Sequence, residues 1–227
     1  MVNNIILQHW DGDLNELTEL SVDNIRSYAS MIGADYELIR GKPFRSHLTA
    51  PCQKVHCISS DFDGYDQVLM LDPDVFVVKG LDKDIFDEIG NGIHGPTQKL
   101  LKKRLTGHRR MNPTGPYWAG SIYKFDWSER LSLRQQLPNN DQWMDFYNKA
   151  YHFEDEGILA TLASKARLPQ RYLDFRWNQC SFLPNPEEAY MLHIRTKKPG
   201  MIHGSWDNGG KQPKIDNYKY LVEKEII

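Results

Sequence analysis

Two carboxylates stand two residues apart near the first third of the chain, in Asp72-Pro73-Asp74. Short apolar runs flank them, Val68 to Leu71 on one side and Val75 to Val78 on the other. Such runs, bounded by polar residues, are typical of strands buried on both faces of a parallel sheet. In one continuous strand both carboxylates would be buried together, which is costly without a positive partner. We therefore expect the strand to end at Asp72, with both carboxylates facing a divalent cation, Mn²⁺ or Mg²⁺.

A plain turn is the alternative at this position, because Asp and Pro are common turn formers. The flanking apolar runs count against a solvated turn, which does not need them. The carboxyl end of a parallel strand is also where open α/β sheets place their ligands. The spacing and the flanking sequence together favour a cation site.

Two histidines near the end of the chain are candidates for a third ligand. His193 closes a strand expected from Glu187 to Ile194, and His203 follows ten residues later, with basic residues between them. A lone histidine is more often structural than a ligand. The paired carboxylates upstream favour one of these two as part of a metal and phosphate site.

The elements that must position these residues begin with a strand-helix-strand unit. A strand is expected from Asn4 to His9, an amphipathic helix from Leu14 to Ile32, and a second strand from Tyr36 to Arg40. This order predicts a parallel sheet with right-handed crossovers. The first strand ends in Gln8 and His9, which either face a nucleotide or belong to an ordinary loop.

Further elements are expected along the rest of the chain. We expect helices at Pro51 to Ser60, Leu81 to Ile89 and Asn139 to Tyr151, and an alternating strand in the second half of Tyr117 to Phe125. The basic segment from Gly95 to Gly115 is either a solvated loop or a flap that meets phosphate or an acidic acceptor. Three acids, Glu154 to Glu156, precede an apolar helix, where the helix dipole alone could explain them.

Composition limits the class of protein. The chain has 227 residues, of which 40% are hydrophobic and 26% charged, enough for a sizeable core in one domain. A formal net charge of −2 gives no reason to expect nucleic acid or an anionic membrane as partner. The three cysteines lack C-x-x-C spacing, which indicates a reducing compartment. With neither a signal peptide nor an apolar stretch of roughly 20 residues, we expect a cytoplasmic protein without a membrane span.

These features together resemble the GT-A class of nucleotide-sugar-dependent glycosyltransferases, over roughly Asn4 to Trp206. Asp72-Pro73-Asp74 resembles the D-x-D that binds a divalent metal and the donor diphosphate. Trp118 to Ser121 resembles the glycine-containing loop that faces sugar and acceptor. Phe153-Glu154-Asp155 is similar to the x-E-D element, whose Asp is the catalytic base in inverting members. The short chain is similar to compact cytoplasmic enzymes of bacteria and large DNA viruses.

The resemblance also implies how the metal and the phosphates are held. His193 resembles the late histidine that completes the metal site, and Lys198-Pro199 the lysine-proline that touches phosphate. The segment lacks the glycine of the family pattern, which leaves His203 as the alternative ligand. Lys54 stands where related enzymes often carry a basic residue that contacts the donor.

The resemblance implies a GT-A, Rossmann-like α/β fold. We expect a mostly parallel central sheet flanked by helices, a small antiparallel ribbon on the acceptor side, a nucleotide-binding half at 1–80 and an acceptor-binding half at 81–227. It also implies a metal-dependent transferase that moves sugar from a nucleoside diphosphate sugar, by family habit a UDP-sugar, to a hydroxyl of a glycan or glycoprotein. Asp155 would be the base if configuration inverts. Glu156 is the second candidate for the base, or a contact for the acceptor, and same-face attack with retention stays open.

Two other functions fit part of the pattern. Phosphatases of the haloacid dehalogenase type also carry D-x-D after an apolar strand, but normally on the first strand, and with Thr or Val where this chain has Phe76. A non-catalytic module that binds nucleotide or sugar is the second alternative. The intact acidic motifs count against a protein that has lost its chemistry.

Overall fold

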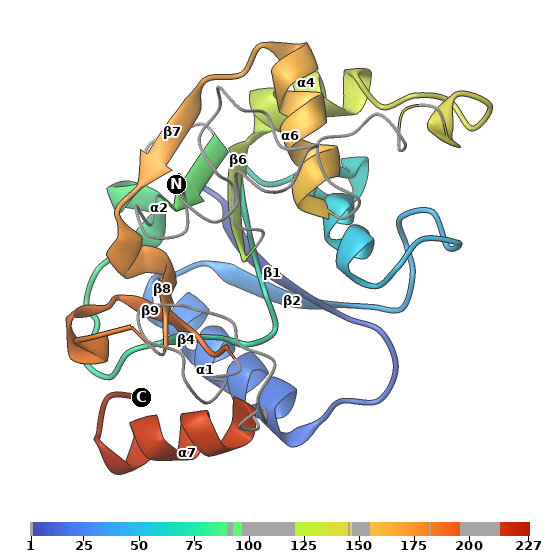
Figure 1. Ribbon diagram of the computed structural model, residues 1–227. Helices are drawn as coiled ribbons and strands as arrows, with labels where there is room; N and C mark the ends of the chain where they lie inside the picture. The colour runs from blue at the N-terminus through green and yellow to red at the C-terminus, as the bar shows by residue number, and fades with distance from the viewer. Residues whose placement is uncertain are drawn as a thin grey trace.

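The computed structural model describes residues 2–89, 93–96, 121–144, 146, 155–181, 183–195 and 214–227. These residues fold around a central sheet that carries helices on both faces (Figure 1). Within these ranges no helix combines the length and the apolar character that crossing a bilayer requires.

The central sheet has four strands in the order β2-β1-β3-β6. β1 (Asn4–Trp10) pairs in parallel with β2 (Asp35–Arg40) and with β3 (Gln67–Leu71). β6 (Ile122–Asp126) runs antiparallel to β3. The mostly parallel central sheet expected from the sequence is therefore confirmed. Because β1 and β3 lie in the middle, the residues that follow β3 are placed at the carboxyl edge of the sheet.

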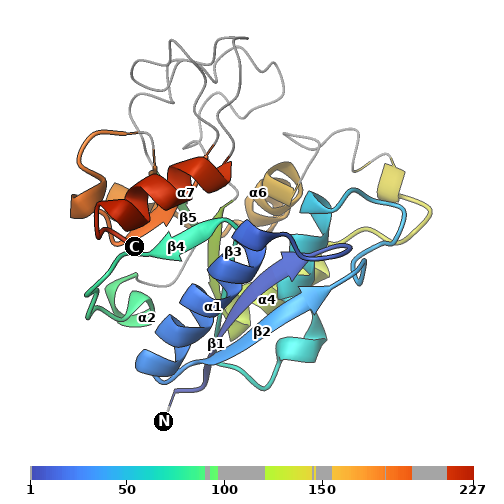
Figure 2. The same cartoon turned by 90° about the horizontal axis from the view of Figure 1, so that it is seen from below.

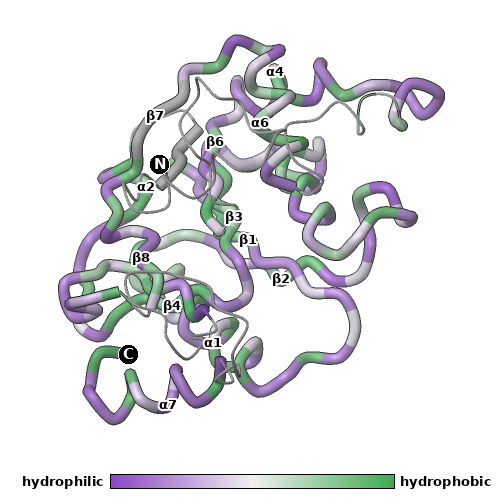
Figure 3. The backbone as a smooth tube through the Cα atoms, in the orientation of Figure 1, coloured by the Kyte–Doolittle hydropathy of each residue, from purple (hydrophilic) through white to green (hydrophobic). Residues whose placement is uncertain are grey.

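β3 is apolar along its length because both of its faces are buried. Val68 and Met70 pack into one core, and Leu69 and Leu71 pack into the other. Figure 3 shows β3 in the green of hydrophobic residues inside the molecule. Burial on both sides explains why the sequence shows an unbroken apolar run here instead of alternation.

Helix α1 (Glu16–Met31) covers one face of the sheet (Figure 2). It begins after Asn15, whose side chain accepts a hydrogen bond from the Thr18 N–H at 3.0 Å and so satisfies one free donor of the first turn. Ile25 and Ala29 carry its apolar stripe into the core beneath β1 and β3. The spacing of these residues explains why the helix could be predicted.

Two polar residues of α1 hold strand β4 (Val75–Val77). Ser21 Oγ donates to the Val75 carbonyl at 2.8 Å. Asn24 donates to the Val77 carbonyl at 3.1 Å and accepts from the Val77 N–H at 2.7 Å. The helix thus satisfies backbone groups of β4 that do not face a neighbouring strand.

The other face of the sheet is covered by the 3-10 helix η1 (Pro51–Ile58) and by helices α4 (Trp127–Gln135) and α6 (Asp155–Ala166). Val55, Leu133 and Ile158 bring these elements into one core with β1 and β3. η1 and α6 are in direct contact with each other. This packing places the first turn of α6 next to η1, close to the carboxyl end of β3.

Two smaller sheets complete the fold. In the first, β4 pairs antiparallel with β9 (Met191–His193), and β8 (Gln179–Cys180) pairs in parallel with β9. The β4–β9 pair is a small antiparallel ribbon, while the acceptor-side position expected for such a ribbon stays a prediction. In the second, β5 (Ile93–Pro96) and β7 (Gln170–Leu173) are parallel. The remaining elements are η2 (Ser60–Phe62), α2 (Ile85–Glu88), η3 (Phe175–Asn178), η4 (Pro186–Glu188) and α7 (Lys214–Glu223).

Some predicted elements were longer than the observed ones. The helix expected at Leu81 to Ile89 is only α2, because the Asp84 side chain caps it by accepting from the Phe86 N–H. The strand expected at Glu187 to Ile194 is reduced to β9, because Pro186 opens the 3-10 helix η4 in its place. The helix expected at Pro51 to Ser60 is the 3-10 helix η1, whose first N–H groups bond to carbonyls three residues earlier.

Other differences concern elements that the sequence did not reveal. β6 is buried on both faces instead of alternating, with Lys124 donating to the Phe86 carbonyl at 2.6 Å. The strands β5, β7 and β8 and the helices α4 and α7 were not predicted, nor were the short 3-10 helices η2, η3 and η4. The helix expected at Asn139 to Tyr151 lies partly outside the described residues. The division into halves at residue 80 stays a prediction.

Candidate metal and donor site

The two carboxylates of Asp72-Pro73-Asp74 sit where the chain leaves the central sheet. β3 ends at Leu71, and the Asp72 N–H donates to the Ser121 carbonyl at 2.9 Å. The Val75 N–H then donates back to the Asp72 carbonyl at 3.2 Å, which closes a turn. Pro73 suits this turn because it has no N–H to satisfy. The chain therefore moves from β3 into the second sheet across this turn.

Strand β9 brings His193 to the same turn. In the β4–β9 pair, His193 lies opposite Val75, and the Ile194 N–H donates to the Asp74 carbonyl at 2.8 Å. His193 Nε2 lies 3.2 Å from Asp74 Oδ1 and 3.7 Å from Asp72 Oδ2. The backbone pairing of two strands thus fixes the imidazole beside both carboxylates.

This donor set fits a divalent cation. One ligand atom from each of Asp72, Asp74 and His193 can be chosen so that all three lie within 4.8 Å of one another. Carboxylate oxygens suit Mg²⁺ and Mn²⁺, and a single imidazole is a common additional ligand. The structure therefore brings together the three residues predicted as metal ligands, while ligation itself stays a prediction.

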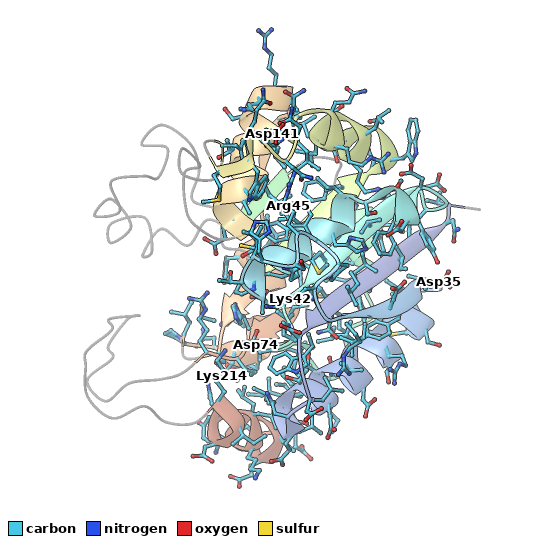
Figure 4. The ribbon with its side chains drawn as sticks, turned by 90° about the vertical axis from the view of Figure 1, so that its right-hand side faces the viewer. Asp35, Lys42, Arg45, Asp74, Asp141 and Lys214 are labelled. Carbon is cyan, nitrogen blue, oxygen red and sulfur yellow. The ribbon has the colours of Figure 1, made fainter. Side chains whose placement is uncertain are left out.

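A lysine that the sequence did not point to also reaches this group. Lys214, the first residue of α7, forms an ion pair through Nζ with Asp74 Oδ2 (Figure 4). Burial alone would raise the pKa of Asp74, but His193 and Lys214 hold that pKa well below its ordinary value. Asp74 is therefore ionised at neutral pH and available as an anionic ligand.

Lys54 joins the cation site to Asp155. The Lys54 side chain is only 8% exposed, and its Nζ pairs with Asp72 Oδ1 and, at 2.7 Å, with Asp155 Oδ2. Burial alone would lower the pKa of Lys54, but the Asp155 and Asp72 carboxylates raise it above its ordinary value. One ammonium group is therefore shared between the first residue of the D-x-D and the first residue of α6.

Tyr123 is the second partner of Asp155. Its hydroxyl, on the buried strand β6, donates to Asp155 Oδ2 at 2.6 Å. Burial raises the pKa of Asp155, while Lys54 and Tyr123 oppose the increase. Asp155 and Glu156 do lie in the first turn of α6, as a dipole effect would require. A capping role does not explain why Lys54 and Tyr123 both bind the Asp155 carboxylate. Asp155 therefore belongs to the site.

Gln8 and His9, predicted to contact the donor, lie at the end of β1. Gln8 is fully buried, and its amide donates to Ser21 Oγ at 2.9 Å and to the Asp72 carbonyl at 3.1 Å, and accepts from the Tyr36 hydroxyl. His9 Nε2 is 2.7 Å from the Gly41 carbonyl, and burial lowers the pKa of His9. Gln8 thus supports the Asp72 backbone from inside the sheet, and donor contact by either residue stays a prediction.

The remaining predicted residues are placed only in part. Glu156 is half-buried in the first turn of α6, beside Asp155. Lys198 and His203, most of the basic segment, Trp118 to Gly120 and Phe153-Glu154 lie outside the described residues. We favour His193 over His203 as the third metal ligand because His193 lies beside both carboxylates.

Tyr123 and Lys214 were not among the residues predicted from the sequence. Tyr123 belongs to a strand that was predicted, but nothing in its neighbours indicates a carboxylate partner. Lys214 opens a helix whose Ile215, Tyr218 and Val222 recur at helical spacing, which was a usable signal for α7 but not for its contact.

Comparison with known proteins gives matches at the level of structure. No protein-family model matches the chain, and no curated protein sequence does. A glycosyltransferase involved in the glycosylation of the major capsid of PBCV-1 superimposes with a TM-score of 0.59 at 14% identity, over 97% of this chain and 99% of that one.

Two structures of LgtC are also similar. An active-site mutant of LgtC superimposes with a TM-score of 0.54 at 14% identity, over 98% of this chain and 96% of that one. The galactosyltransferase LgtC in complex with donor and acceptor sugar analogues gives 0.50 at 16% identity, over 83% of this chain and 86% of that one. At these identities the likeness establishes the fold, and the GT-A fold predicted from the sequence is confirmed.

Proposed function

We propose that the protein is a glycosyltransferase that depends on a divalent metal ion and moves a sugar from a nucleoside diphosphate sugar, a UDP-sugar, to an acceptor hydroxyl. One observation carries this proposal. At the carboxyl end of β3, Asp72, Asp74 and His193 form a cluster that fits a metal, and Lys54 links this cluster to Asp155 by pairing with both Asp72 and Asp155. The GT-A fold and the glycosyltransferases that share it support the proposal.

Asp72, Asp74 and His193 would hold the metal, with Mn²⁺ favoured over Mg²⁺ because of the imidazole. Held by these three residues, a divalent cation would supply positive charge against the leaving diphosphate. The chain itself contributes fixed positive charge through Lys54, which is buried between Asp72 and Asp155. Preorganised charges of this kind are usually the largest catalytic contribution.

Asp155 is the proposed base in an inverting reaction. Lys54 and Tyr123 both bind its Oδ2 atom, which fixes the orientation of the carboxylate. Its raised pKa makes it a better proton acceptor than an ordinary aspartate. It would take the proton of the acceptor hydroxyl as that oxygen attacks the sugar. Glu156, on the same helical turn, would bind acceptor hydroxyls.

The acceptor would be a glycan or a glycoprotein, bound by segments from residue 81 onward, while residues 1–80 bind the nucleotide. We place the enzyme in the cytoplasm, as proposed from the sequence. The cluster around Asp72 draws on both halves, since Lys54 comes from the first and Asp155 and His193 from the second. Donor binding would therefore require the two halves to be packed together as they are here.

Donor hydrolysis tests the proposed function without knowledge of the acceptor. The protein is incubated with Mn²⁺ and each member of a panel of UDP-sugars, and released UDP is measured. We expect slow release from one or a few donors, because water can replace the acceptor, and no release above background for Asp74→Asn. The control Asp141→Asn changes an exposed carboxylate at the far end of the molecule (Figure 4) and should behave as wild type.

Two outcomes would contradict the proposal. Release of phosphate from an aryl phosphate, lost on Asp72→Asn, would favour the phosphatase alternative. Metal-dependent binding of UDP without turnover of any donor and acceptor would favour a non-catalytic binding module.

A further inference from the structure

Helix α7 is docked through one face onto chain segments that adjoin the cation site. Asn217, Tyr218 and Leu221 follow Lys214 at spacings of three, four and seven, which places all four on one side of the helix. Leu221 is fully buried, and the Tyr218 ring packs on Phe76 of β4 with a centroid distance of 4.9 Å. The apolar end of this face therefore anchors α7 against the strand that follows Asp74.

The polar part of the same face holds the end of β9. Asn217 donates to Ser181 Oγ at 2.6 Å and to the Arg195 carbonyl at 3.3 Å, and Ser181 Oγ also accepts from the Arg195 N–H at 3.2 Å. Arg195 lies two residues after His193. α7 is therefore fixed through Tyr218 to β4, the strand that follows Asp74, and through Asn217 to the chain just after β9, the strand that ends at His193.

The amino end of this docked face delivers Lys214 to Asp74. The Lys214 ammonium binds Asp74 Oδ2, while Oδ1 of the same carboxylate faces His193. The Lys214 side chain is 41% exposed, whereas that of Asp74 is 14% exposed. The lysine reaches the carboxylate from the solvent side, so its head group can leave without disturbing the docked helix.

We propose that Lys214 is an internal counter-ion that competes with the divalent cation for Asp74 and, once displaced, binds the anionic diphosphate that enters with the cation. This inference rests on the proposed function. An ammonium and a divalent cation repel each other strongly at the distances of a shared carboxylate. Lys54 is buried and is also held by Asp155, so the partly exposed Lys214 is the lysine that withdraws when the cation binds. Its flexible four-carbon stem leaves it near the site.

The proposal predicts effects of opposite sign for Lys214→Met. In the absence of nucleotide the variant lacks a competitor, so Mn²⁺ alone should bind about three- to fivefold more tightly, which corresponds to one partly exposed ion pair. With saturating Mn²⁺, UDP should bind about tenfold more weakly, because a charge-assisted contact to phosphate is lost. Loss of a merely structural contact would weaken both.

Calorimetric titration measures both affinities on the full chain. Mn²⁺ is titrated into wild type, Lys214→Met and Lys214→Arg, and UDP is then titrated in the presence of saturating Mn²⁺. Lys214→Arg keeps the charge and should stay close to wild type in both titrations. The matched control is Lys219→Met, which removes the same charge from the same helix at an exposed pair with Glu16, 3.8 Å apart.

The Mn²⁺ titration decides the inference separately from the proposed function. If wild type binds Mn²⁺ and Lys214→Met binds it equally or more weakly, Lys214 is not a competitor and the inference is overturned while the metal site stands. If neither wild type nor Lys214→Met binds Mn²⁺, the metal site and the inference fall together. Circular dichroism of each variant shows that the fold is retained.

Discussion

Replacing Asp155 with asparagine is expected to lower kcat/KM by about 100- to 10,000-fold, because a positioned general base contributes a factor of this size. Asparagine fills the same space and still accepts from Tyr123 and Lys54, so the fold and the affinity for Mn²⁺ and UDP should change little. The measurement is the steady-state rate of UDP release from the donor that the hydrolysis screen identifies, with calorimetry for UDP binding.

The pH dependence of kcat/KM tests the role of the Asp155 carboxylate independently. Burial raises the pKa of Asp155 above its ordinary 3.8, so the acid limb of kcat/KM should lie at higher pH than for an exposed aspartate. Tyr123→Phe removes a hydrogen bond that favours the ionised carboxylate. The limb should therefore move to still higher pH in this variant, while activity on its alkaline side is mostly retained.

An unchanged rate in Asp155→Asn would remove this residue from the mechanism. Glu156→Gln is the informative companion, because Glu156 is the other acid of the same turn. Loss of activity in Glu156→Gln alone would transfer the role of base to Glu156.

Lys54→Met is expected to lower the free energy of unfolding by about 3–5 kcal/mol at pH 7, the usual cost of removing one partner from a buried ion pair. The Lys54 ammonium bridges Asp72 and Asp155 from a position that is 8% exposed. Without it, two carboxylates face each other in a poorly solvated site. Urea denaturation of both proteins measures the difference.

The loss of stability in Lys54→Met should become smaller as the pH falls. The pKa of Lys54 is raised in the folded protein, so its stabilisation is fully present below the ordinary 10.5 and is lost only as pH rises through the raised value. In the variant, Asp155 can relieve the repulsion by binding a proton. The difference between wild type and Lys54→Met should therefore shrink as pH falls from 7 to 5.

Lys42→Met is the control for this prediction. Lys42 pairs with Asp11 at 3.8 Å, and both side chains are about a third or more exposed (42% and 32%). Its removal should change stability by less than about 1 kcal/mol. A cost for Lys54→Met no larger than that for Lys42→Met would mean that the buried bridge does not stabilise the fold.

The central strands and the D-x-D turn could be predicted because they depend on local sequence. β3 is buried on both faces, so its residues form an unbroken apolar run, and Pro73 marks the point where the strand ends. α1 shows helical spacing and a capping residue. Burial pattern and turn chemistry are both visible in a few adjacent residues.

The partners of the site could not be predicted, because they depend on elements that meet only in the fold. Lys214 and Asp74 are 140 residues apart in the chain. Tyr123 meets Asp155 because β6 runs antiparallel to β3 and α6 packs on the same face. Gln8 shows a further limit, since a polar residue at a strand end can face a ligand or, as its bonds to Ser21 and Asp72 show here, the interior.

The central claim is that Asp74 belongs to a metal site that binds the donor diphosphate. The most direct measurement is calorimetric titration of UDP into wild type, Asp74→Asn and the control Asp141→Asn, each with Mn²⁺ and again with excess EDTA. We expect UDP to bind wild type and Asp141→Asn in Mn²⁺, and to bind more than about 100-fold more weakly in EDTA or in Asp74→Asn, because a metal ligand is lost. Equal binding with and without the metal, or no binding of UDP or GDP to the folded protein, would contradict the claim and leave Asp72-Pro73-Asp74 as a structural turn or a phosphatase motif.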